Sequence, residues 1–333
     1  MSVDYYMWYL LPNIYPTFEY RVNPYRPLNH GYLIKMKTTK QSIVTRFAPS
    51  PTGHLHLGHA MAALYAYDMA REYGADGRFL LRLEDIDTSR VRPEFEESIF
   101  TDLEWLGLEW ETPVRRQSGH MKDYSAALGR LGDMGLLYPC FCTRGEIMAE
   151  IEQSSNAPHM ITYGPDGALY PGTCRKLSDD ILQEKKAARS PYALRLNMQK
   201  ALAKVKDQLI WPLKWTDTNK GEIKATPEIF ADVVLARKDI PTSYHLAVSI
   251  DDHLQGVTMV TRGEDLFSAT HIHRLIQALL SLDVPNYSHH GLITDKNNIR
   301  LAKRDKATTL KTLRESGYTP ADIRNMVGLK AKG

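Results

Sequence analysis

The stretch from Arg46 to His59 contains the side chains of this chain that are best placed to bind a ligand or to take part in catalysis. A predicted strand ends, prolines stiffen the loop that follows, and a helix begins near Gly58, where the missing side chain lets a flat ring or a phosphate approach the backbone. A helix N-terminus offers unpaired N–H groups and a partial positive charge, which favour phosphate. His56 and His59 lie three residues apart and can donate hydrogen bonds to phosphate oxygens as charge develops. The stretch predicts a phosphate site, whereas an isolated histidine pair of this spacing would indicate solvated or metal-binding side chains.

The elements around this loop predict a parallel α/β sheet. Strands are expected at 42–48 and 79–84, and apolar residues at helical spacing predict helices at 58–73 and 93–106. Strands that alternate with helices are typical of parallel sheets, whose ligands bind at the carboxyl ends of the strands. The periodicity breaks around 139–175, which indicates an insertion. It resumes at 192–197, at 230–236 and in a helix at 269–282, and short polar helices are expected in the tail at 308–329.

Three cysteines suggest a metal rather than a disulfide. Cys140 and Cys142 are separated by one residue, and Cys174 follows after a gap. The odd count argues against a secreted disulfide framework and favours the reducing cytosol. Zinc prefers four ligands, mostly thiolate and imidazole. Three thiols leave one position, for which Tyr163, His159 or water are candidates, and three free thiols are the alternative.

The composition is that of an ordinary globular protein. The 333 residues are 43% hydrophobic and 24% charged, with a formal net charge of +3, which permits a polyanionic partner without requiring one. No segment approaches the roughly 18 consecutive apolar residues of a membrane span. Residues 1–40 lack the ordered parts of a signal peptide. We therefore expect a cytoplasmic protein, in which residues 1–40 are either an ordered extension or sequence upstream of a start at Met36.

Several strings in the chain resemble class I aminoacyl-tRNA synthetases. His56-Leu-Gly-His59 resembles their first signature, His-Ile-Gly-His, and the string Arg-Phe-Ala-Pro-Ser-Pro-Thr-Gly before it is similar to glutamyl-tRNA synthetases in particular. Similar strings follow at 81–87, 244–253 and 256–264, so the resemblance covers roughly residues 43–310. The second signature of the class, a lysine-rich loop, corresponds to Arg300-Leu-Ala-Lys-Arg304, where arginine replaces the first lysine and alanine the serine.

This resemblance implies an α/β, Rossmann-like class I synthetase catalytic domain that binds L-glutamate and Mg²⁺ with ATP. A pocket for glutamate needs an acid for its ammonium group and at least one arginine for its carboxylates. The implied glutamate-binding residues are Arg46, Ala48, Ser50, Glu84, Tyr244 and Arg262, with Ser50 and Glu84 on the amino group. The implied ATP-binding residues are His56, Gly58, His59 and Lys303, of which His56, His59 and Lys303 are catalytic. Taken singly, Arg46 and Glu84 would also suit a structural ion pair, and Tyr244 a core position.

The cysteine pattern resembles the zinc site of one branch of this family, the short glutamyl-queuosine synthetases. In that branch a Cys-x-Cys is followed by Tyr-x-x-x-Cys, which here corresponds to Tyr170 and Cys174. The resemblance therefore implies one structural zinc held by Cys140, Cys142, Tyr170 and Cys174. The gap of 28 residues between Cys142 and Tyr170 is longer than usual for the branch.

The resemblance also predicts the domain organisation and the reaction. We expect an N-terminal extension at 1–40, two halves of a catalytic domain at 41–138 and 191–290, a zinc-binding insertion at 139–190, and a lysine loop with a small helical remnant at 291–333, without an anticodon-binding domain. The expected reaction is ATP-dependent activation of glutamate and its transfer to queuosine at the wobble position of tRNA(Asp), by a monomer. A truncated glutamyl-tRNA synthetase and a non-catalytic, RNA-binding paralogue are the alternatives.

Overall fold

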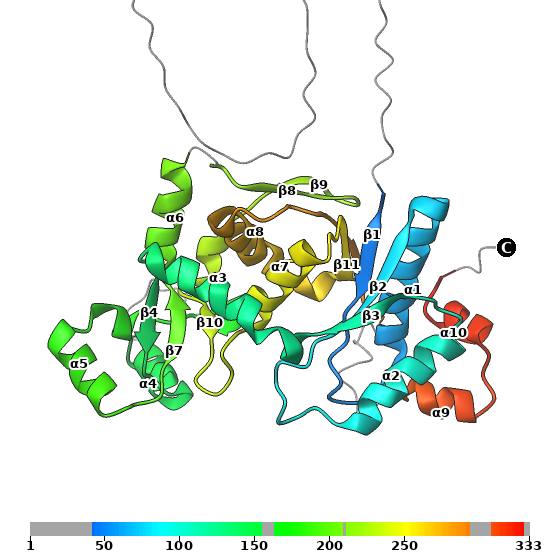
Figure 1. Cartoon of the computed structure of the whole chain (residues 1–333), viewed down its shortest axis with the longest axis horizontal. Coiled ribbons are helices and arrows are strands. Elements are labelled where there is room, and N and C mark those ends of the chain that lie inside the picture. The colour runs from blue at the N-terminus through cyan, green and yellow to red at the C-terminus, as the bar shows by residue number, and fades with distance from the viewer. Residues whose placement is uncertain (1–41, 155–162, 209–210, 294–307, 330–333) are drawn as a thin grey trace, which may run out of the picture. The chain divides into compact units, whose positions relative to one another are not determined.

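A parallel sheet at the start of the chain organises the fold (Figure 1). The computed structural model describes residues 42–154, 163–208, 211–293 and 308–329. The first sheet has the order β1-β2-β3, with parallel strands β1 (Val44–Phe47), β2 (Arg78–Leu83) and β3 (Glu111–Arg116). Helices α1 (Leu57–Arg71) and α2 (Pro93–Trp105) form the two connections between these strands. Strands β1 and β2 are almost wholly buried, as is typical of parallel strands.

A second sheet continues the first one. Its order is β11-β12-β8-β9, in which β11, β12 and β8 are parallel and β9 is antiparallel. The Thr258 N–H donates to the Val44 carbonyl at 3.1 Å, and the Arg46 side chain donates to the Thr261 carbonyl, so β1 and β11 lie side by side in the same direction. The elements are β8 (Lys214–Asp217), β9 (Gly221–Lys224), α7 (Tyr244–Leu254), β11 (Met259–Gly263), α8 (Ala269–Leu280) and β12 (Asn286–His290).

The middle of the chain adds an antiparallel sheet of order β10-β7-β4 and a short hairpin, β5-β6. The strands are β4 (Leu137–Cys140), β5 (Tyr163–Gly164), β6 (Gly167–Ala168), β7 (Ala193–Leu196) and β10 (Val234–Ala236). The helices are α3 (Met121–Asp133), α4 (Arg144–Ser154), α5 (Asp179–Ala187) and α6 (Met198–Asp207). The segment around 139–175, where the sequence pattern breaks, therefore contains a regular helix, α4.

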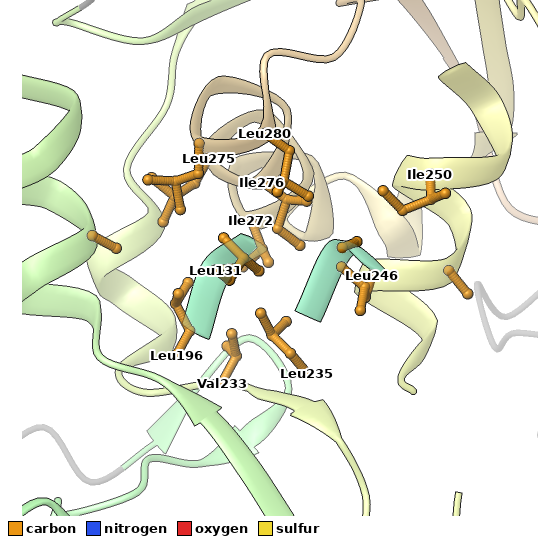
Figure 2. Packing of buried hydrophobic residues seen from close by; sticks show 14 of the residues in the cluster. Leu131, Leu196, Val233, Leu235, Leu246, Ile250, Ile272, Leu275, Ile276 and Leu280 are labelled. Carbon is orange, nitrogen blue, oxygen red and sulfur yellow. The ribbon is translucent and has the colours of Figure 1, made fainter. Parts of the chain in front are cut away.

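Two apolar cores hold these layers together. One lies where α3, α7 and α8 meet the antiparallel sheet, and Figure 2 shows Leu131 of α3 beside Leu196 of β7 and Ile272 of α8. The other lies between the first sheet and its helices, where Leu64, Leu81 and Leu103 are buried. Burial of each such side chain contributes roughly 1.5–3 kcal/mol, so the two cores supply most of the stabilisation of the strands that carry the site.

The tail packs on the first sheet's helices. Helices α9 (Leu310–Glu315) and α10 (Pro320–Met326) bury Leu310 and Ile323 in the core around α1 and α2. Arg324 of α10 makes a two-pronged ion pair with Asp68 of α1, at 2.8 and 2.9 Å. The predicted helical remnant is therefore part of the packed structure.

The elements predicted around the histidine loop are confirmed to within about two residues, which is the usual uncertainty of element ends. The α/β class with a parallel sheet is confirmed as well. The predicted element at 230–236 is shorter in the structure. A 3-10 turn, Pro227–Phe230, ends where that stretch begins, and strand β10 covers Val234–Ala236. The predicted domain boundaries stay predictions. Residues 1–40, His159 and the loop 300–304 with Lys303 lie outside the described residues.

Candidate active site and metal centre

A cavity of about 310 Å³ opens at the carboxyl ends of β1, β2 and β11, beside the first turn of α1. Open α/β sheets bind their ligands at this edge. The predicted site residues that lie within the described ranges all line this cavity, apart from the metal ligands. These are Arg46, Ala48, Ser50, His56, Gly58, His59, Glu84, Tyr244 and Arg262.

The two histidines of the loop hold each other and the start of α1. Nδ1 of His56 accepts the Gly58 N–H at 3.0 Å, and Nδ1 of His59 accepts the His56 N–H at 3.2 Å. A neutral imidazole that accepts at Nδ1 carries its proton on Nε2. The two hydrogen bonds of the cap therefore leave the proton of each imidazole on Nε2. Each side chain can donate this N–H to an anion in the cavity.

His59 is neutral at physiological pH. Burial and the neighbouring His56 lower its pKa from the ordinary 6.5 to about 3. The ring centroids of the two histidines are 3.9 Å apart. Positive charge for an anion at this site therefore comes from the start of α1 and from nearby arginines, while His59 supplies a hydrogen bond.

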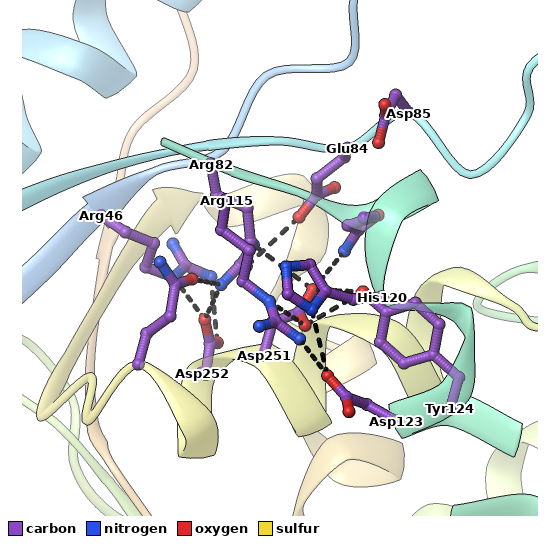
Figure 3. A network of polar contacts seen from close by, with 12 residues as sticks. Arg46, Arg82, Glu84, Asp85, Arg115, His120, Asp123, Tyr124, Asp251 and Asp252 are labelled. Carbon is purple, nitrogen blue, oxygen red and sulfur yellow. Dashed lines mark hydrogen bonds and ion pairs between the residues drawn. The ribbon is translucent and has the colours of Figure 1, made fainter. Parts of the chain in front are cut away.

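Arg46 belongs to a buried network of ions that reaches under the cavity (Figure 3). Its guanidinium donates to both oxygens of Asp252 of α7, at 2.9 and 3.3 Å. Arg82 of β2, which is fully buried, donates to the same carboxylate at 2.7 Å and to Glu84 at 3.3 Å. Asp252 therefore sets the position of one arginine that lines the cavity and of a second that holds Glu84.

A second acid of α7 completes the network. Asp251 accepts hydrogen bonds from Arg115 at 2.7 Å, from Gln117 at 2.8 Å and from the Tyr124 hydroxyl at 2.9 Å. This carboxylate is fully buried, so its partners must satisfy its charge. Asp251 thereby ties α7 to β3 and α3, on the side away from Arg46.

Glu84 is one of two acids that line the cavity, the other being Asp265. Burial raises its pKa, and the guanidiniums of Arg82 and Arg46 act in the opposite direction. A carboxylate in this position gains from a cation placed beside it, since a cation relieves part of the cost of burial. Glu84 is thus suited to receive an ammonium group.

Arg262 and Tyr244 form another wall of the cavity. Arg262 is 5% exposed, and it donates to the imidazoles of His273 and His289 at 3.2 Å each and to the Thr270 hydroxyl. Among the described residues, its hydrogen-bond partners are a hydroxyl and two imidazoles with lowered pKa values, and none of these contacts is with an acid. The cavity therefore offers a cation from Arg262 and an anion from Glu84.

The three cysteines meet in a cluster at the start of the middle segment. The sulfur atoms of Cys140, Cys142 and Cys174 all lie within 4.8 Å of one another, and Cys140 and Cys174 are buried. The Tyr170 hydroxyl lies 3.7 Å from the Cys142 sulfur and accepts the Cys174 N–H at 2.8 Å. The predicted ligands of a metal are therefore adjacent.

The geometry of the cluster fits a tetrahedral ion. With Zn–S bonds of about 2.3 Å, thiolates of a tetrahedral site lie about 3.8 Å apart. The sulfur atoms of Cys142 and Cys174 are 3.3 Å apart, and all three sulfur atoms lie within 4.8 Å of one another. Burial alone would raise the pKa of the Cys174 thiol, but hydrogen bonds from Tyr170 and from the Phe141 N–H outweigh it and lower that pKa. The pKa of Cys142 is raised to about 12, by burial and by its hydrogen bond with Cys174. A thiol that readily becomes thiolate is suited to bind a metal.

Sequence reasoning missed the residues that support the site. Arg82 and Asp252 stand inside strings noted for their resemblance, but no role was predicted for them. A charged residue within the apolar run of β2 was the available signal for Arg82. Asp252 and the histidines of α8 and β12 gave none, because their partners are far away in the sequence.

The comparisons with known proteins agree with this geometry. Residues 42–331 match the family model of "tRNA synthetases class I (E and Q), catalytic domain". A Glutamyl-Q tRNA(Asp) synthetase of Rhodobacter capsulatus is 49% identical over 86% of this chain and 100% of its own length. One of Nocardia farcinica is 43% identical over 84% of this chain and 81% of its own.

A glutamate–tRNA ligase of Coprothermobacter proteolyticus is 36% identical over 86% of this chain, which spans 58% of that protein. Among solved structures, a glutamate–tRNA synthetase of Elizabethkingia anophelis superposes with a TM-score of 0.70 at 28% identity, over 86% of this chain and 61% of that one. The resemblance inferred from the strings is confirmed: the chain belongs to the class I tRNA synthetases of the glutamate and glutamine type, through their catalytic domain.

Proposed function

We propose that this protein activates L-glutamate with ATP and transfers it to queuosine in tRNA(Asp). The activation of glutamate is supported by the cavity, which Glu84, Arg46 and Arg262 line beside the N-terminus of α1. Glutamate carries one ammonium and two carboxylates, which this arrangement complements. As a member of its family the chain is an ATP-dependent ligase, and the names of its relatives support the second half of the proposal.

In the proposed first step an α-carboxylate oxygen of glutamate attacks the α-phosphorus of Mg²⁺-ATP. A new P–O bond forms, the bond from the α-phosphorus to the bridging oxygen breaks, and pyrophosphate leaves with the electron pair. Ser50 and Glu84 hold the ammonium group, and Arg46 lies near the carboxylates. The Nε2–H groups of His56 and His59 donate to phosphate oxygens as charge builds up. Most of the rate enhancement comes from positioning and charge stabilisation.

In the second step a ring hydroxyl of the acceptor attacks the glutamyl carbonyl carbon and forms an ester. The bond from that carbon to the phosphate oxygen breaks, AMP leaves with the electron pair, and the hydroxyl proton passes to the AMP phosphate or to solvent. The cis-diol of queuosine stands in for the terminal ribose diol that a glutamyl-tRNA synthetase uses. The proposal extends to a structural zinc, with Cys140, Cys142, Cys174 and Tyr170 as its ligands. The proximity of these four side chains supports it.

Pyrophosphate exchange tests the activation step. The purified protein should exchange labelled pyrophosphate into ATP when glutamate is added and no RNA is present. Glu84→Gln should reduce this exchange about 100-fold or more, because it removes the negative charge for the ammonium group. Glu72→Gln, an exposed position at the end of α1, is the control. Exchange that needs tRNA, or exchange with glutamine but not glutamate, would contradict the proposal.

Transfer tests the acceptor. Labelled glutamate is offered with queuosine-containing tRNA(Asp), with the same tRNA lacking the modification, and with glutamate tRNA. We expect labelling of the first alone, and it should be lost after periodate oxidation of the cis-diol. Equal labelling with and without queuosine, or 3′-end charging of glutamate tRNA, would favour a conventional glutamate–tRNA ligase, to which the chain is also similar.

A further inference from the structure

Two histidines enclose the guanidinium of Arg262. Its Nε donates to Nε2 of His289 and its Nη1 to Nδ1 of His273, both at 3.2 Å. Its Nη2 donates to the Thr270 hydroxyl at 2.5 Å. These contacts use three of the five N–H groups of the guanidinium, and the residue lines the cavity. These contacts fix the orientation of the guanidinium, and its other N–H groups can donate to a ligand in the cavity.

An aspartate sets the tautomer of the first histidine. Nδ1 of His289 lies 2.6 Å from Oδ2 of Asp217, and both side chains are fully buried. The Asp217 carboxylate also accepts the N–H of Asn219 at 2.9 Å and of Lys220 at 3.2 Å, so it cannot turn away without losing them. With its proton on Nδ1, the ring presents Nε2 to Arg262 as an acceptor.

A longer chain of contacts sets the second tautomer. Nε2 of His273 lies 3.1 Å from Nδ1 of His245, and Nε2 of His245 lies 3.1 Å from Asp166. Asp166 stands between β5 and β6, in the hairpin of the middle segment. If each ring donates toward the aspartate, His273 is left with Nδ1 as an acceptor for Arg262. The hairpin is in this way connected to the wall of the cavity.

We propose that His273 and His289 are positioning residues, which hold Arg262 in place as neutral acceptors so that its full charge is available to the side-chain carboxylate of the substrate. The inference rests on the proposed function, since it assumes that the ligand is glutamate. An aspartate or glutamate in either place would hold the guanidinium equally well. Its negative charge would also offset the positive charge of the guanidinium and would compete with the substrate's carboxylate for it.

The electrostatics agree with this assignment. Burial, followed by the charge of Arg262, lowers the pKa of His289 to about 4, and the same causes lower that of His273 well below its ordinary value. Both rings are therefore neutral wherever the enzyme would work. A buried arginine that is paired with neutral acceptors recognises an anion more strongly than one that is already paired with an acid.

The test distinguishes a role of His289 as a hydrogen-bond acceptor from a role in packing alone. His289→Leu removes the acceptor, whereas His289→Gln keeps a carbonyl oxygen near the position of Nε2. In pyrophosphate exchange, His289→Leu should raise the KM for glutamate by about 10- to 100-fold, as loss of a hydrogen bond to a charged group does. Its KM for ATP should be unchanged, its preference for glutamate over glutamine should fall, and His289→Gln should recover most of the loss.

His271→Leu is the matched control. His271 is a buried histidine of the same helix as His273, but its Nδ1 accepts the Thr226 N–H and not Arg262. Its replacement should leave the KM for glutamate unchanged. A His289→Leu protein with normal glutamate KM and selectivity would overturn the inference. Absence of glutamate-dependent exchange in the unmodified protein would instead overturn the proposed function.

Nitrogen NMR of the unmodified protein tests the tautomers without any activity. Long-range ¹H–¹⁵N correlations should show His289 protonated on Nδ1 and His273 on Nε2, both neutral, at about neutral pH. Either ring in the opposite tautomer or in the doubly protonated form would contradict the inference. This measurement decides the question if His289→Leu fails to fold.

Discussion

Arg46 of β1 and Asp252 of α7 are 206 residues apart in the sequence, yet they form a two-pronged ion pair at 2.9 and 3.3 Å. The same carboxylate accepts a hydrogen bond from Arg82 of β2 at 2.7 Å. Burial opposes the charge of Asp252, but the two guanidiniums outweigh burial and hold its pKa below the ordinary value. One side chain thus aligns two strands of the sheet with a helix from the second half of the chain.

Asp252→Asn should therefore destabilise the protein by about 3 kcal/mol, because it leaves two buried guanidiniums short of a counter-charge. It should also weaken glutamate binding, since Arg46 loses its support. Urea unfolding measures the first effect and pyrophosphate exchange the second. Asp239→Asn, which breaks an exposed ion pair with Arg237, should change neither. Equal stability of the two variants would contradict the role assigned to Asp252.

Gly58→Ala should lower the rate of pyrophosphate exchange. A Cβ at this position would come within 2.9 Å of the His56 ring and displace it from its cap. Because His56 donates to the phosphates in the proposed mechanism, we expect the exchange rate to fall at least about tenfold. Gly129→Ala in α3 is the control, since a Cβ there meets nothing within 4 Å. Gly129→Ala should gain up to about 1 kcal/mol of stability from helix propensity, whereas Gly58→Ala should lose about 1 kcal/mol with the His56 cap. A fully active Gly58→Ala protein would refute the argument.

Metal analysis tests the cysteine cluster. The protein should contain one zinc per chain, and its removal by a chelator should destabilise the middle segment by several kcal/mol, as for other structural sites. The three thiols should react with an alkylating agent only after that removal. Tyr170→Phe should weaken zinc binding, while Tyr163→Phe, at an exposed position of the hairpin, should not. Protein purified without chelators that holds no zinc and has freely reactive thiols would exclude the site.

Stability should fall as the pH is lowered below about 6.5. The folded-state pKa values are about 3 for His59 and about 4 for His289, below the ordinary 6.5, so the unfolded chain binds more protons at mildly acidic pH. The contribution of these groups is complete above pH 6.5 and is lost as the pH falls toward the folded-state values.

His59→Asn keeps an acceptor for the His56 N–H but cannot take up the proton. Its free energy of unfolding should fall by about 2 kcal/mol less than that of the unmodified protein between about pH 7 and about pH 5. Urea unfolding at the two pH values measures the difference. Parallel losses in both proteins would show that His59 titrates normally in the folded state.

Local sequence patterns predict the elements around the histidine loop and the residues of the loop itself. The periodicity of α1 and the apolar runs of β1 and β2 are local patterns, so their bounds could be predicted. The loop with His56, Gly58 and His59 is also local, because a helix start and its cap depend on neighbours a few residues away. The close pair Cys140 and Cys142 is local as well, whereas Cys174 joins it from 32 residues further along the chain.

The surroundings of these residues depend instead on how the layers of the fold pack. The partners of Arg46 and Arg82 on α7, and the histidines that hold Arg262, come from segments far apart in the sequence. A buried charge must find its partner wherever the packed layers bring one, and sequence spacing does not record that position. The sequence thus points to the groups proposed to bind glutamate and phosphate, while the packing of β1, α7, β11 and α8 sets how each group is oriented and charged.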